Sequence, residues 1–452
     1  MSESSKPRVL WIWHAAVIAE YQKPLAALAA TGAWAVHLLV PTAWPERAGQ
    51  SVALERRTAP DYAIHAGSVW FPQHYYIYLF PGLLGTLLRV RPAVLHVYEE
   101  PHSLLPALIL AVRPLLERWW GRRVPVILYA AQNIVKRYPP PFCWFEQFCF
   151  RHADAILPCG VGVAATLRQK GYRGPLRRVP LPTDPAVFRR DPTAGAAVRA
   201  AHGIPAAAVV IGYAGKLVAE KGVATLLQAF LRLPATATGP HLLIAGDGPL
   251  RVALAAAAQA AGAADRVHLV GALDHAALVA HLSAGDLWVV PSETRPQWRE
   301  QFGRAAVEAM ACGNAVVVSD SGELPRVVGP AGRVVPEGDP AALAAVLAAL
   351  CADPAGRAVL AAAGRARVLA CYTPAQAARL YAAAYRVALG ARNGNTEPRR
   401  LTGGCNGVFN GGLPGFRRCW GSGCNLRRDQ GKAGFCAARR MTRSPFSAQP
   451  RQ

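Results

Sequence analysis

The sequence has few charged residues, no Cys-x-x-Cys pair and no long hydrophobic run. Only 17% of its 452 residues are charged, whereas 52% are hydrophobic. This balance excludes a disordered chain and supplies enough apolar material for two or three domains. The missing cysteine pairs disfavour a zinc or thioredoxin-type site. No apolar run approaches the roughly 20 residues that a membrane-spanning helix needs, so we expect a cytoplasmic protein.

Acidic residues are also scarce, with 27 Asp and Glu against 50 Lys and Arg, which gives a formal net charge of +23. The excess is uneven, because the net charge is +11 over residues 1–190, +2 over 191–390 and +10 over 391–452. The last segment is rich in Gly, Arg and Asn without apolar periodicity, so we expect a disordered tail. Neither repeats nor interleaved aromatics favour specific nucleic-acid binding by this tail, and we interpret it as a dispensable extension.

Short apolar runs alternate with helical stretches along the body of the chain, a pattern typical of α/β layers around parallel sheets. A Pro-rich stretch at 179–192 separates two such series. We therefore predict two facing Rossmann-like domains, residues 1–190 and 191–373, with a final helix at 374–390 that completes the first. The expected strands are 8–13, 34–40, 93–98, 125–130 and 155–160 in the first series, and 209–215, 241–246, 266–271, 287–291 and 315–320 in the second.

The segment GYAGKLVAEKG (212–222) begins the second series and has features of an anion site. Gly215 follows a predicted strand and allows a ligand to approach the backbone, and a helix is expected to begin near Gly222. Lys216 and Lys221 add two cations at the same strand end, which suits a diphosphate. A glycine turn with two solvated lysines fits this segment equally well. It is neither a Walker A loop nor a GxGxxG motif, which disfavours an NTPase or a nicotinamide enzyme.

The segment 291–320 places two carboxyl groups around one helix start. Glu300 lies in the loop before a helix that is expected to begin at Phe302–Gly303, and Glu308 lies about one turn inside it. The free amides and dipole of this helix start would stabilise negative charge. A carboxylate ahead of it could hold sugar hydroxyls, and one inside could bind a ribose diol. Between the two segments, IAGDGPL (244–250) predicts a glycine turn in which Gly246 lines the nucleotide side of the site.

These motifs resemble, in order, those of family 4 retaining glycosyltransferases of the GT-B fold, also described as glycosyl transferases group 1. The matching elements cover nearly all of 205–390: GKLVAEKG, AGDGPL, the run from GALDH to VVPS, EQFGRAAVEAMACG with its E-x7-E spacing, and SDSGELPRVVG. The resemblance implies that Lys216 and Lys221 bind the donor diphosphate, Glu300 the transferred sugar and Glu308 the ribose. It also places the Phe302–Gly303 backbone beside the sugar and phosphate, and makes Glu300 and Lys221 the catalytic residues.

The first half is similar to the same family more loosely. HVYEEPHSL (96–104) and the segment from 129 to 142 resemble stretches that line the acceptor side, which makes Glu99, Glu100, Gln132 and Asn133 acceptor-side candidates. Two family features are missing: a Gly-Gly loop after the first strand, and a histidine at the position of Gln132–Asn133. His14, His96 and His102 lie near strand ends, where a lone histidine is more often structural.

Together these observations predict a retaining hexosyltransferase that uses a nucleoside diphosphate sugar, with neither a metal ion nor a cofactor. The acceptor is expected to be a glycan or lipid-linked molecule. A sugar-nucleotide epimerase of the same fold is the enzymatic alternative. The non-enzymatic alternative is a basic nucleic-acid-binding protein, which leaves Glu300 and Glu308 unexplained.

The basic first domain also suggests an anionic membrane surface as a partner. Basic pairs such as Arg122–Arg123 stand beside Trp119–Trp120, and Phe142, Trp144 and Phe145 follow a proline run. Each Lys or Arg near anionic lipid contributes about 1 kcal/mol to binding. We therefore expect peripheral attachment to the cytoplasmic face of the membrane, against the alternative of a generally basic protein.

Overall fold

The computed structural model of the chain describes residues 6–45, 51–56, 61–235 and 239–390. Within these residues the chain forms two six-stranded parallel sheets and one antiparallel hairpin, β3 (Ala43–Pro45) with β4 (Ser51–Ala53). The described residues all belong to one compact unit. The predicted α/β class with two Rossmann-like sheets is confirmed, whereas the tail predicted at 391–452 lies outside the described residues.

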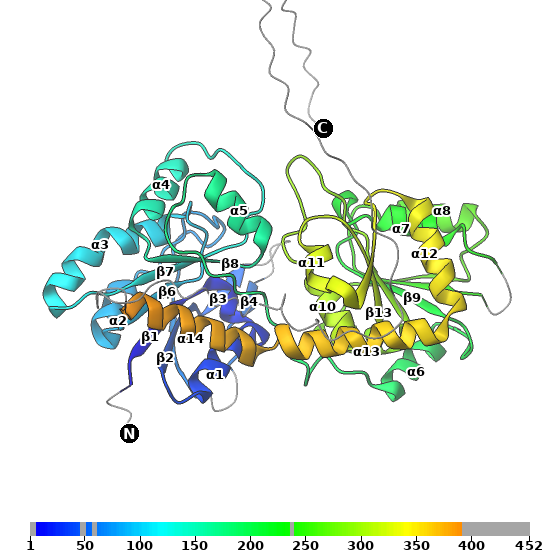
Figure 1. The fold of residues 1–452 in the computed structure, drawn as a ribbon, viewed down its shortest axis with the longest axis horizontal. Helices are drawn as coiled ribbons and strands as arrows, with labels where there is room; N and C mark the ends of the chain where they lie inside the picture. The colour runs from blue at the N-terminus through cyan, green and yellow to red at the C-terminus, as the bar shows by residue number, and fades with distance from the viewer. Residues whose placement is uncertain (1–5, 46–50, 57–60, 236–238, 391–452) are drawn as a thin grey trace, which may run out of the picture. The chain divides into compact units, whose positions relative to one another are not determined.

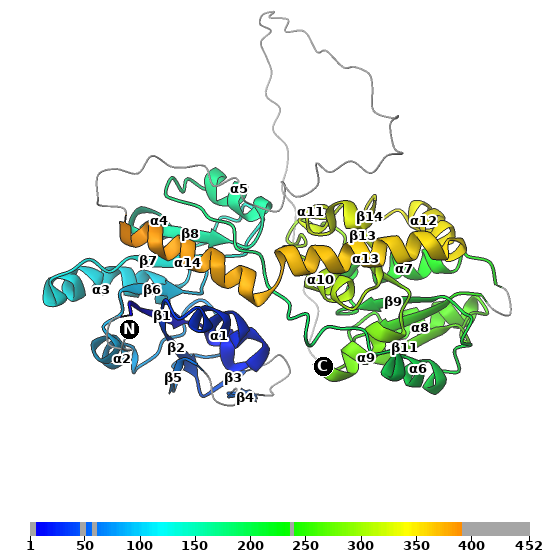
Figure 2. The same cartoon turned by 60° about the horizontal axis from the view of Figure 1, so that its bottom comes forward.

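The first sheet has the strand order β5-β2-β1-β6-β7-β8 (Figures 1 and 2; β5 is labelled in Figure 2). Its central strands are near-continuous apolar runs, as expected when helices cover both faces of a parallel sheet. The strands are β1 (Arg8–Ile12), β2 (Ala35–Pro41), β5 (Ala63–Gly67), β6 (Val94–Val97), β7 (Val126–Ala130) and β8 (Ala155–Pro158). The helices of this half are α1 (Lys23–Ala30), α2 (Leu83–Val90), α3 (Leu104–Trp120), α4 (Phe142–His152) and α5 (Val161–Gln169).

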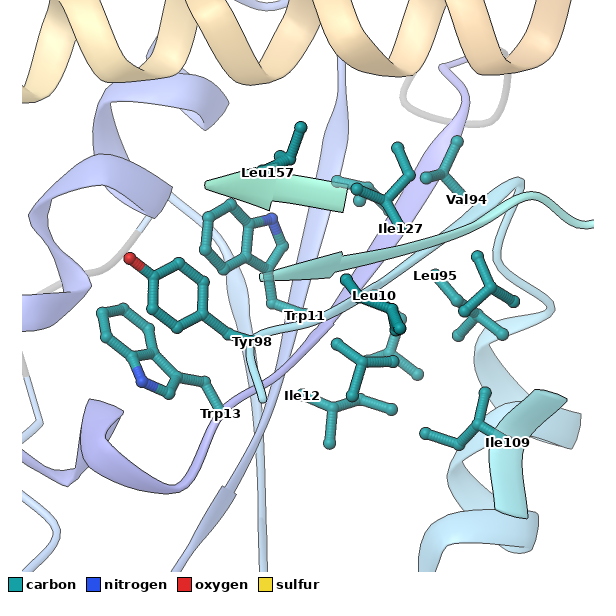
Figure 3. Close-up of a cluster of buried hydrophobic side chains, with 14 of the residues drawn as sticks. Leu10, Trp11, Ile12, Trp13, Val94, Leu95, Tyr98, Ile109, Ile127 and Leu157 are labelled. Atoms are coloured by element: carbon teal, nitrogen blue, oxygen red, sulfur yellow. The ribbon is translucent and has the colours of Figure 1, made fainter. Parts of the chain in front are cut away.

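The core of the first sheet is unusually aromatic. Trp11 stacks on Tyr98 with ring centroids 5.7 Å apart, and Trp13 lies 4.1 Å from the same tyrosine (Figure 3). His96 is fully buried beside them, its Nδ1 lies 2.7 Å from the hydroxyl of Tyr385, and burial lowers its pKa to about 3. A neutral, packed imidazole of this kind has a structural role, as the sequence suggested for this residue.

The last described helix, α14 (Pro374–Gly390), lies beside α1 in both views (Figures 1 and 2). Its buried face includes Tyr381 and Tyr385, and both side chains belong to the core of the first sheet. The chain therefore returns to its first half after the second sheet is complete.

The second sheet repeats the topology of the first, with the order β11-β10-β9-β12-β13-β14. The strands are β9 (Val210–Ala214), β10 (His241–Ala245), β11 (Val267–Gly271), β12 (Leu287–Val290), β13 (Ala315–Ser319) and β14 (Gly332–Val335). The helices are α6 (Pro192–Ala201), α7 (Val223–Phe230), α8 (Arg251–Ala260), α9 (His275–Ala284), α10 (Arg304–Ala311), α11 (Leu324–Val328), α12 (Pro340–Ala352) and α13 (Pro354–Cys371).

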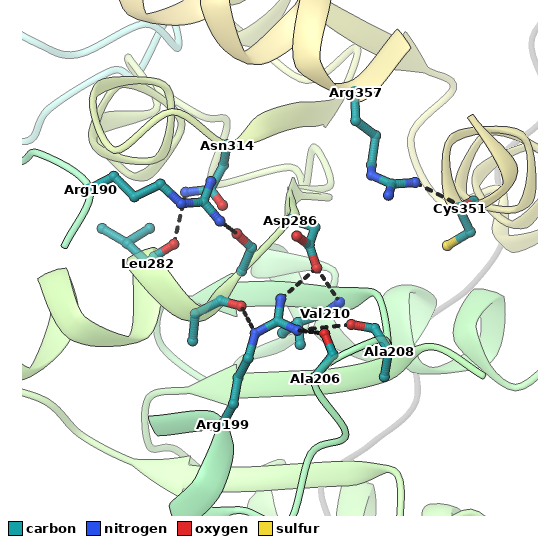
Figure 4. A network of polar contacts seen from close by, with 12 residues as sticks. Arg190, Arg199, Ala206, Ala208, Val210, Leu282, Asp286, Asn314, Cys351 and Arg357 are labelled. Carbon is teal, nitrogen blue, oxygen red and sulfur yellow. Dashed lines mark hydrogen bonds and ion pairs between the residues drawn. The ribbon is translucent and has the colours of Figure 1, made fainter. Parts of the chain in front are cut away.

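Arg199 connects α6 to the second sheet. Its guanidinium donates 2.7 Å to the Asp286 carboxylate and also to the backbone oxygens of Ala284 and Ala208 (Figure 4 shows the arginine and its partners). Asp286 in turn accepts from the backbone N–H of Val210, the first residue of β9. Because planar guanidinium groups hold several acceptors at fixed angles, this cluster sets the position of α6 against β9 and β12.

Both sheets reverse their strand order between the first strand and the fourth, which is where ligands bind in doubly wound folds. In the first sheet the reversal lies between β1 and β6, and in the second between β9 and β12. The crevice outside the carboxyl ends of these strands is thus the expected position of each site.

All ten predicted strands are present, with ends within two residues of the prediction, and four strands were missed: β3, β4, β5 and β14. No single helix among the described residues is long and apolar enough to cross a membrane. One bent pair, α12 with α13–α14, meets the length and composition criteria together. These helices pack on α7, β13, α10 and α1 within the unit.

Candidate active site

The carboxyl ends of β9 and β10 touch through two glycines. Gly246 has a φ of +136°, and a Cβ there would lie 1.8 Å from the carbonyl oxygen of Gly215. Only glycine fits such a contact, because any side chain would collide with backbone. The close approach opens a cavity of about 450 Å³ at this edge, which Gly215, Lys216, Gly246 and Glu308 line together. The structure therefore brings four of the predicted donor residues to one place.

Lys216, Glu308 and Asp247 are the charged residues that line this cavity. The Lys216 side chain is exposed and forms no ion pair with a described residue. Burial raises the pKa of Glu308 to about 7, an effect that Arg304 partly offsets and Glu20 reinforces. The cavity can thus present a cation to phosphate and, near neutral pH, a carboxyl group that changes between its acid and anionic forms.

Glu300 forms a second polar cluster beside the carboxyl end of β12. Its Oε2 accepts from Lys221 Nζ at 2.8 Å and from Ser292 Oγ at 2.8 Å, and the residue is only 8% exposed. Lys221 Nζ also lies 4.6 Å above the Trp298 ring. The predicted catalytic pair is thus in direct contact. Ser292 and Trp298 were not predicted, because their proximity depends on the path of the loop after β12.

The helix start predicted at Phe302–Gly303 is confirmed, with Gly303 as the N-cap of α10. Phe302 is buried, and its ring packs edge-on against Tyr372 at 5.7 Å. The side chain of Phe302 therefore belongs to the core. A ligand at this point would meet backbone N–H groups of the first turn, which attract anions.

Two contacts join the loops of the two sheets. Asn133, which follows β7, donates from Nδ2 to the carbonyl oxygen of Glu300 at 2.8 Å. Glu323, just before α11, is 3% exposed and accepts from the backbone N–H groups of Val161 and Gly162, in the first turn of α5. Asn133, which was predicted to be an acceptor-side residue, positions the Glu300 backbone through this contact. Glu323 was not predicted for any role.

The other acceptor-side candidates lie at the carboxyl edge of the first sheet. The side chains of two of them accept hydrogen bonds from backbone N–H groups of the loop after β7. Glu100 accepts from the N–H groups of Ala131 and Gln132, at 2.7 and 3.1 Å, and burial raises its pKa to about 7. The Gln132 side chain accepts from the N–H of Ile134. Both residues therefore shape the loop after β7.

Glu99 instead contacts two side chains, Tyr78 and His14. His14 lines a second cavity, of about 460 Å³, together with Trp44, Tyr75 and the donor-side Lys216. His102 is 2% exposed and stacks on Tyr138 at 3.9 Å, so it is structural. Among the described residues, no group of three or more His, Cys, Asp or Glu side chains could hold a metal ion.

Two parallel six-stranded sheets of this topology, with polar clusters at their carboxyl edges, define the GT-B fold. Solved structures agree with it. The sucrose-phosphate synthase of Thermosynechococcus elongatus is similar with a TM-score of 0.64, 22% identity, and coverage of 85% of this chain and 100% of its own. HepE from Anabaena, in complex with UDP and glucose, is similar with a TM-score of 0.61 and 17% identity. The match covers 84% of this chain and 99% of HepE.

The sequence identifies the family within this fold. Residues 196–367 match the family model of glycosyl transferases group 1, which confirms the predicted resemblance to that group over this part of the chain.

Two curated relatives are similar over part of the chain. The 2-deoxystreptamine N-acetyl-D-glucosaminyltransferase of Streptomyces fradiae is 37% identical over 145 residues, which is 31% of this chain and 33% of its own length. The GDP-mannose-dependent monoacylated alpha-(1-6)-phosphatidylinositol monomannoside mannosyltransferase of Corynebacterium glutamicum is 30% identical over 276 residues. The match covers 60% of this chain and 64% of the relative's own length. The chain thus spans less than two thirds of either relative.

Proposed function

We propose that this protein is a retaining glycosyltransferase that transfers a sugar from a nucleoside diphosphate sugar to a hydroxyl group of a glycan or lipid-linked acceptor. The observation that carries the proposal is the cavity at the β9 and β10 ends, where glycine backbone, Lys216 and Glu308 meet. The family of residues 196–367 supports the same activity.

Each part of the cavity suits one part of the donor. Lys216 and the free amides at the start of α10 would bind the diphosphate, since both attract anions. Glu308 in its anionic form would accept hydrogen bonds from the two ribose hydroxyls. Glu300 would bind hydroxyls of the sugar, with Lys221 between it and the phosphates. Because these lysines supply the positive charge that a departing diphosphate requires, the proposed reaction needs neither a metal ion nor a cofactor.

The reaction breaks the bond between the anomeric carbon and a diphosphate oxygen, which leaves with the electron pair. The acceptor oxygen then forms the new bond to that carbon. Retention without a covalent nucleophile requires attack on the face from which the diphosphate departs. The departing phosphate oxygen is then the base closest to the acceptor proton and takes it up, and the chain contributes electrostatic stabilisation and positioning.

A nucleotide-sugar panel tests the proposal. UDP-glucose, UDP-N-acetylglucosamine, GDP-mannose and ADP-glucose are incubated with the protein, and release of nucleoside diphosphate is measured with and without membrane extract as a source of acceptors. Release that depends on the extract supports transfer. Conversion of the sugar without any acceptor would support the epimerase alternative instead.

Nucleoside binding should depend on pH through Glu308. Its pKa of about 7 means that the anion forms between roughly pH 6 and pH 8, so the affinity for free uridine or guanosine should rise several-fold across this interval. Glu308→Gln should bind the same nucleoside weakly and with no pH dependence. Titration calorimetry at pH 6 and 8 measures both, and an unchanged wild-type affinity would place the ribose elsewhere.

We also propose that the acceptor is lipid-linked or presented at a membrane, and that the protein acts at the cytoplasmic membrane surface. The Corynebacterium relative is described as acting on a phosphatidylinositol mannoside, which supports an acceptor of this kind. Exposed side chains of the first half support the proposed binding to a membrane surface. Trp119 is 66% exposed at the end of α3, and Trp144 is 65% exposed on α4. Another exposed aromatic segment, which the sequence analysis missed, contains Trp70, Phe71, Tyr75 and Tyr76.

Vesicle sedimentation tests the membrane proposal. The protein should sediment with phosphatidylglycerol-containing vesicles, and this binding should weaken as the salt concentration rises. With pure phosphatidylcholine vesicles the protein should stay in the supernatant. Replacing Trp119 and Trp144 together by Ser should weaken binding roughly tenfold or more, since two indole rings leave the interface. The matched control replaces Val252 and Val359 of the second half, which are 80% and 68% exposed. It should leave vesicle binding unchanged. Equal binding to anionic and neutral vesicles would contradict the proposal.

A further inference from the structure

His14 is held by a buried carboxylate and is open to a cavity. It follows β1, the central strand at the reversal of the first sheet, and its Nδ1 lies 2.5 Å from Oε1 of Glu99, which follows β6. The Tyr78 hydroxyl donates to the same oxygen at 2.5 Å, and Glu99 and Tyr78 are 6% and 1% exposed. Because a carboxylate only accepts hydrogen bonds, these contacts place the imidazole proton on Nδ1. The Nε2 atom is left as an acceptor, and it has no hydrogen-bond partner among the described residues.

Aromatic rings form the walls of that cavity. Trp44 lies 4.4 Å from the His14 ring, and Tyr75 lies 5.6 Å from it, nearly perpendicular. Both rings line the cavity, as does the apolar side chain of Ile18. Aromatic walls beside one fixed hydrogen-bond acceptor are suited to a sugar-like ring, whose C–H groups pack on aromatic faces while its hydroxyls need polar partners. Of the described residues that line the cavity, none is a carboxylate.

The cavity is also adjacent to the donor cavity, because Lys216 lines both. Its volume of about 460 Å³ is close to that of the donor cavity, which is about 450 Å³. A ring in the His14 cavity would therefore lie next to the diphosphate that Lys216 is proposed to bind. No other lining residue is shared between these two cavities.

We propose that the cavity lined by His14, Trp44 and Tyr75 binds an uncharged ring polyol of the acceptor, and that His14 Nε2 accepts a hydrogen bond from its attacking hydroxyl group. This inference rests on the proposed glycosyltransferase function and adds the acceptor class and the residue that orients it. Glu99 is a positioning residue, which holds His14 in the required tautomer with help from Tyr78. The hydroxyl proton goes to the departing phosphate oxygen, so His14 orients the acceptor oxygen and takes up no proton in the step.

Binding measurements on the full chain test the inference, in the presence of whichever of UDP, GDP, ADP and dTDP binds, at saturation. Myo-inositol, methyl α-D-glucopyranoside and methyl α-D-mannopyranoside are titrated against the wild type and followed by ligand-observed NMR. At least one should bind. His14→Phe keeps the ring packing and removes both nitrogens, and should weaken that binding about tenfold. The affinity for the nucleoside diphosphate and for the intact donor should stay within twofold.

Three further variants separate this role from a structural one. Tyr75→Ala removes an exposed wall residue that the fold does not need, and should also weaken polyol binding without changing the melting temperature. Glu99→Gln removes the charge that fixes the tautomer, so the ring-nitrogen NMR signals of His14 should shift and polyol binding should weaken. His74→Asn, at an exposed position outside the cavity, is the matched control. It should change the affinity neither for the polyol nor for the nucleoside diphosphate.

The outcomes distinguish this inference from the function on which it rests. If none of UDP, GDP, ADP and dTDP binds, the proposed function is wrong. If one of them binds and none of the three polyols does, or if His14→Phe binds the polyol as tightly as the wild type, the acceptor cavity is wrong while the donor site stands.

Discussion

A Glu300→Gln variant should fold normally and lose at least about 100-fold in kcat/KM for sugar transfer, the range for removing one preorganised electrostatic group from a reacting centre. The substitution keeps the size of the side chain and removes the charge that now accepts from Lys221 and Ser292, both at 2.8 Å. Because the Lys221 side chain is 29% exposed, water would solvate its charge and limit the effect on stability.

The matched control is Glu293→Gln in the same loop. Glu293 pairs with Arg295 and accepts from Thr225, and neither contact involves the donor cavity. This variant should keep wild-type activity within about threefold. Steady-state kinetics with the donor identified in the nucleotide-sugar panel measure kcat/KM for both variants and the wild type. Equal losses in the two variants, or near-wild-type activity of Glu300→Gln, would remove Glu300 from the site.

Lys221→Ala should weaken binding of the nucleoside diphosphate by about 1.5–3 kcal/mol, the range for losing a charge-assisted contact. Activity should fall further than affinity, because the substitution also leaves Glu300 without its 2.8 Å ion-pair partner. The free nucleoside should bind as before. Calorimetry with both ligands measures the difference.

Two other cations make this prediction specific. Lys216→Ala should weaken diphosphate binding in the same range, since Lys216 lines the donor cavity. Arg232→Ala removes an exposed cation just after α7 and should have no effect. If Lys221→Ala weakens nucleoside and diphosphate binding equally, Lys221 does not contact the phosphates.

The sequence predicted the strands whose burial leaves a clear apolar run, such as Arg8–Ile12 and Ala315–Ser319. It missed β5 and β14, because these sheet-edge strands are partly exposed: AIHAG has no buried residue, and GRVV exposes two of its four. Edge strands carry less of the apolar pattern on which such predictions depend.

The site was predictable where its chemistry is local in the chain. Gly215, Lys216 and the two glutamates of the E-x7-E spacing come from short segments, and the resemblance to a family assigned their roles. The contacts that position them are not local: Asn133 and Glu300 are 167 residues apart, and His14 and Glu99 are 85 apart. Such pairs form only because the strand order of a doubly wound sheet brings distant loops to one edge.

The same dependence on distant contacts explains why no feature of the sequence singled out His14. A histidine near a strand end is structural in most proteins, and His96 and His102 fit that expectation here. The buried carboxylate behind His14 and the open cavity in front of it become visible only when β1 and β6 are paired.

Thermal unfolding with a ligand panel tests the central claim, a nucleoside diphosphate site at the β9 and β10 ends, most directly. A ligand at 100 times its Kd stabilises the fold by about 2.7 kcal/mol, which raises the melting temperature by several degrees. UDP, GDP, ADP and dTDP are compared at equal concentration, each with the wild type and with Glu308→Gln. We expect the diphosphate of one base to stabilise the wild type, and Glu308→Gln to lose most of this shift. Stabilisation by none of the four, or an equal shift in both proteins, would contradict it.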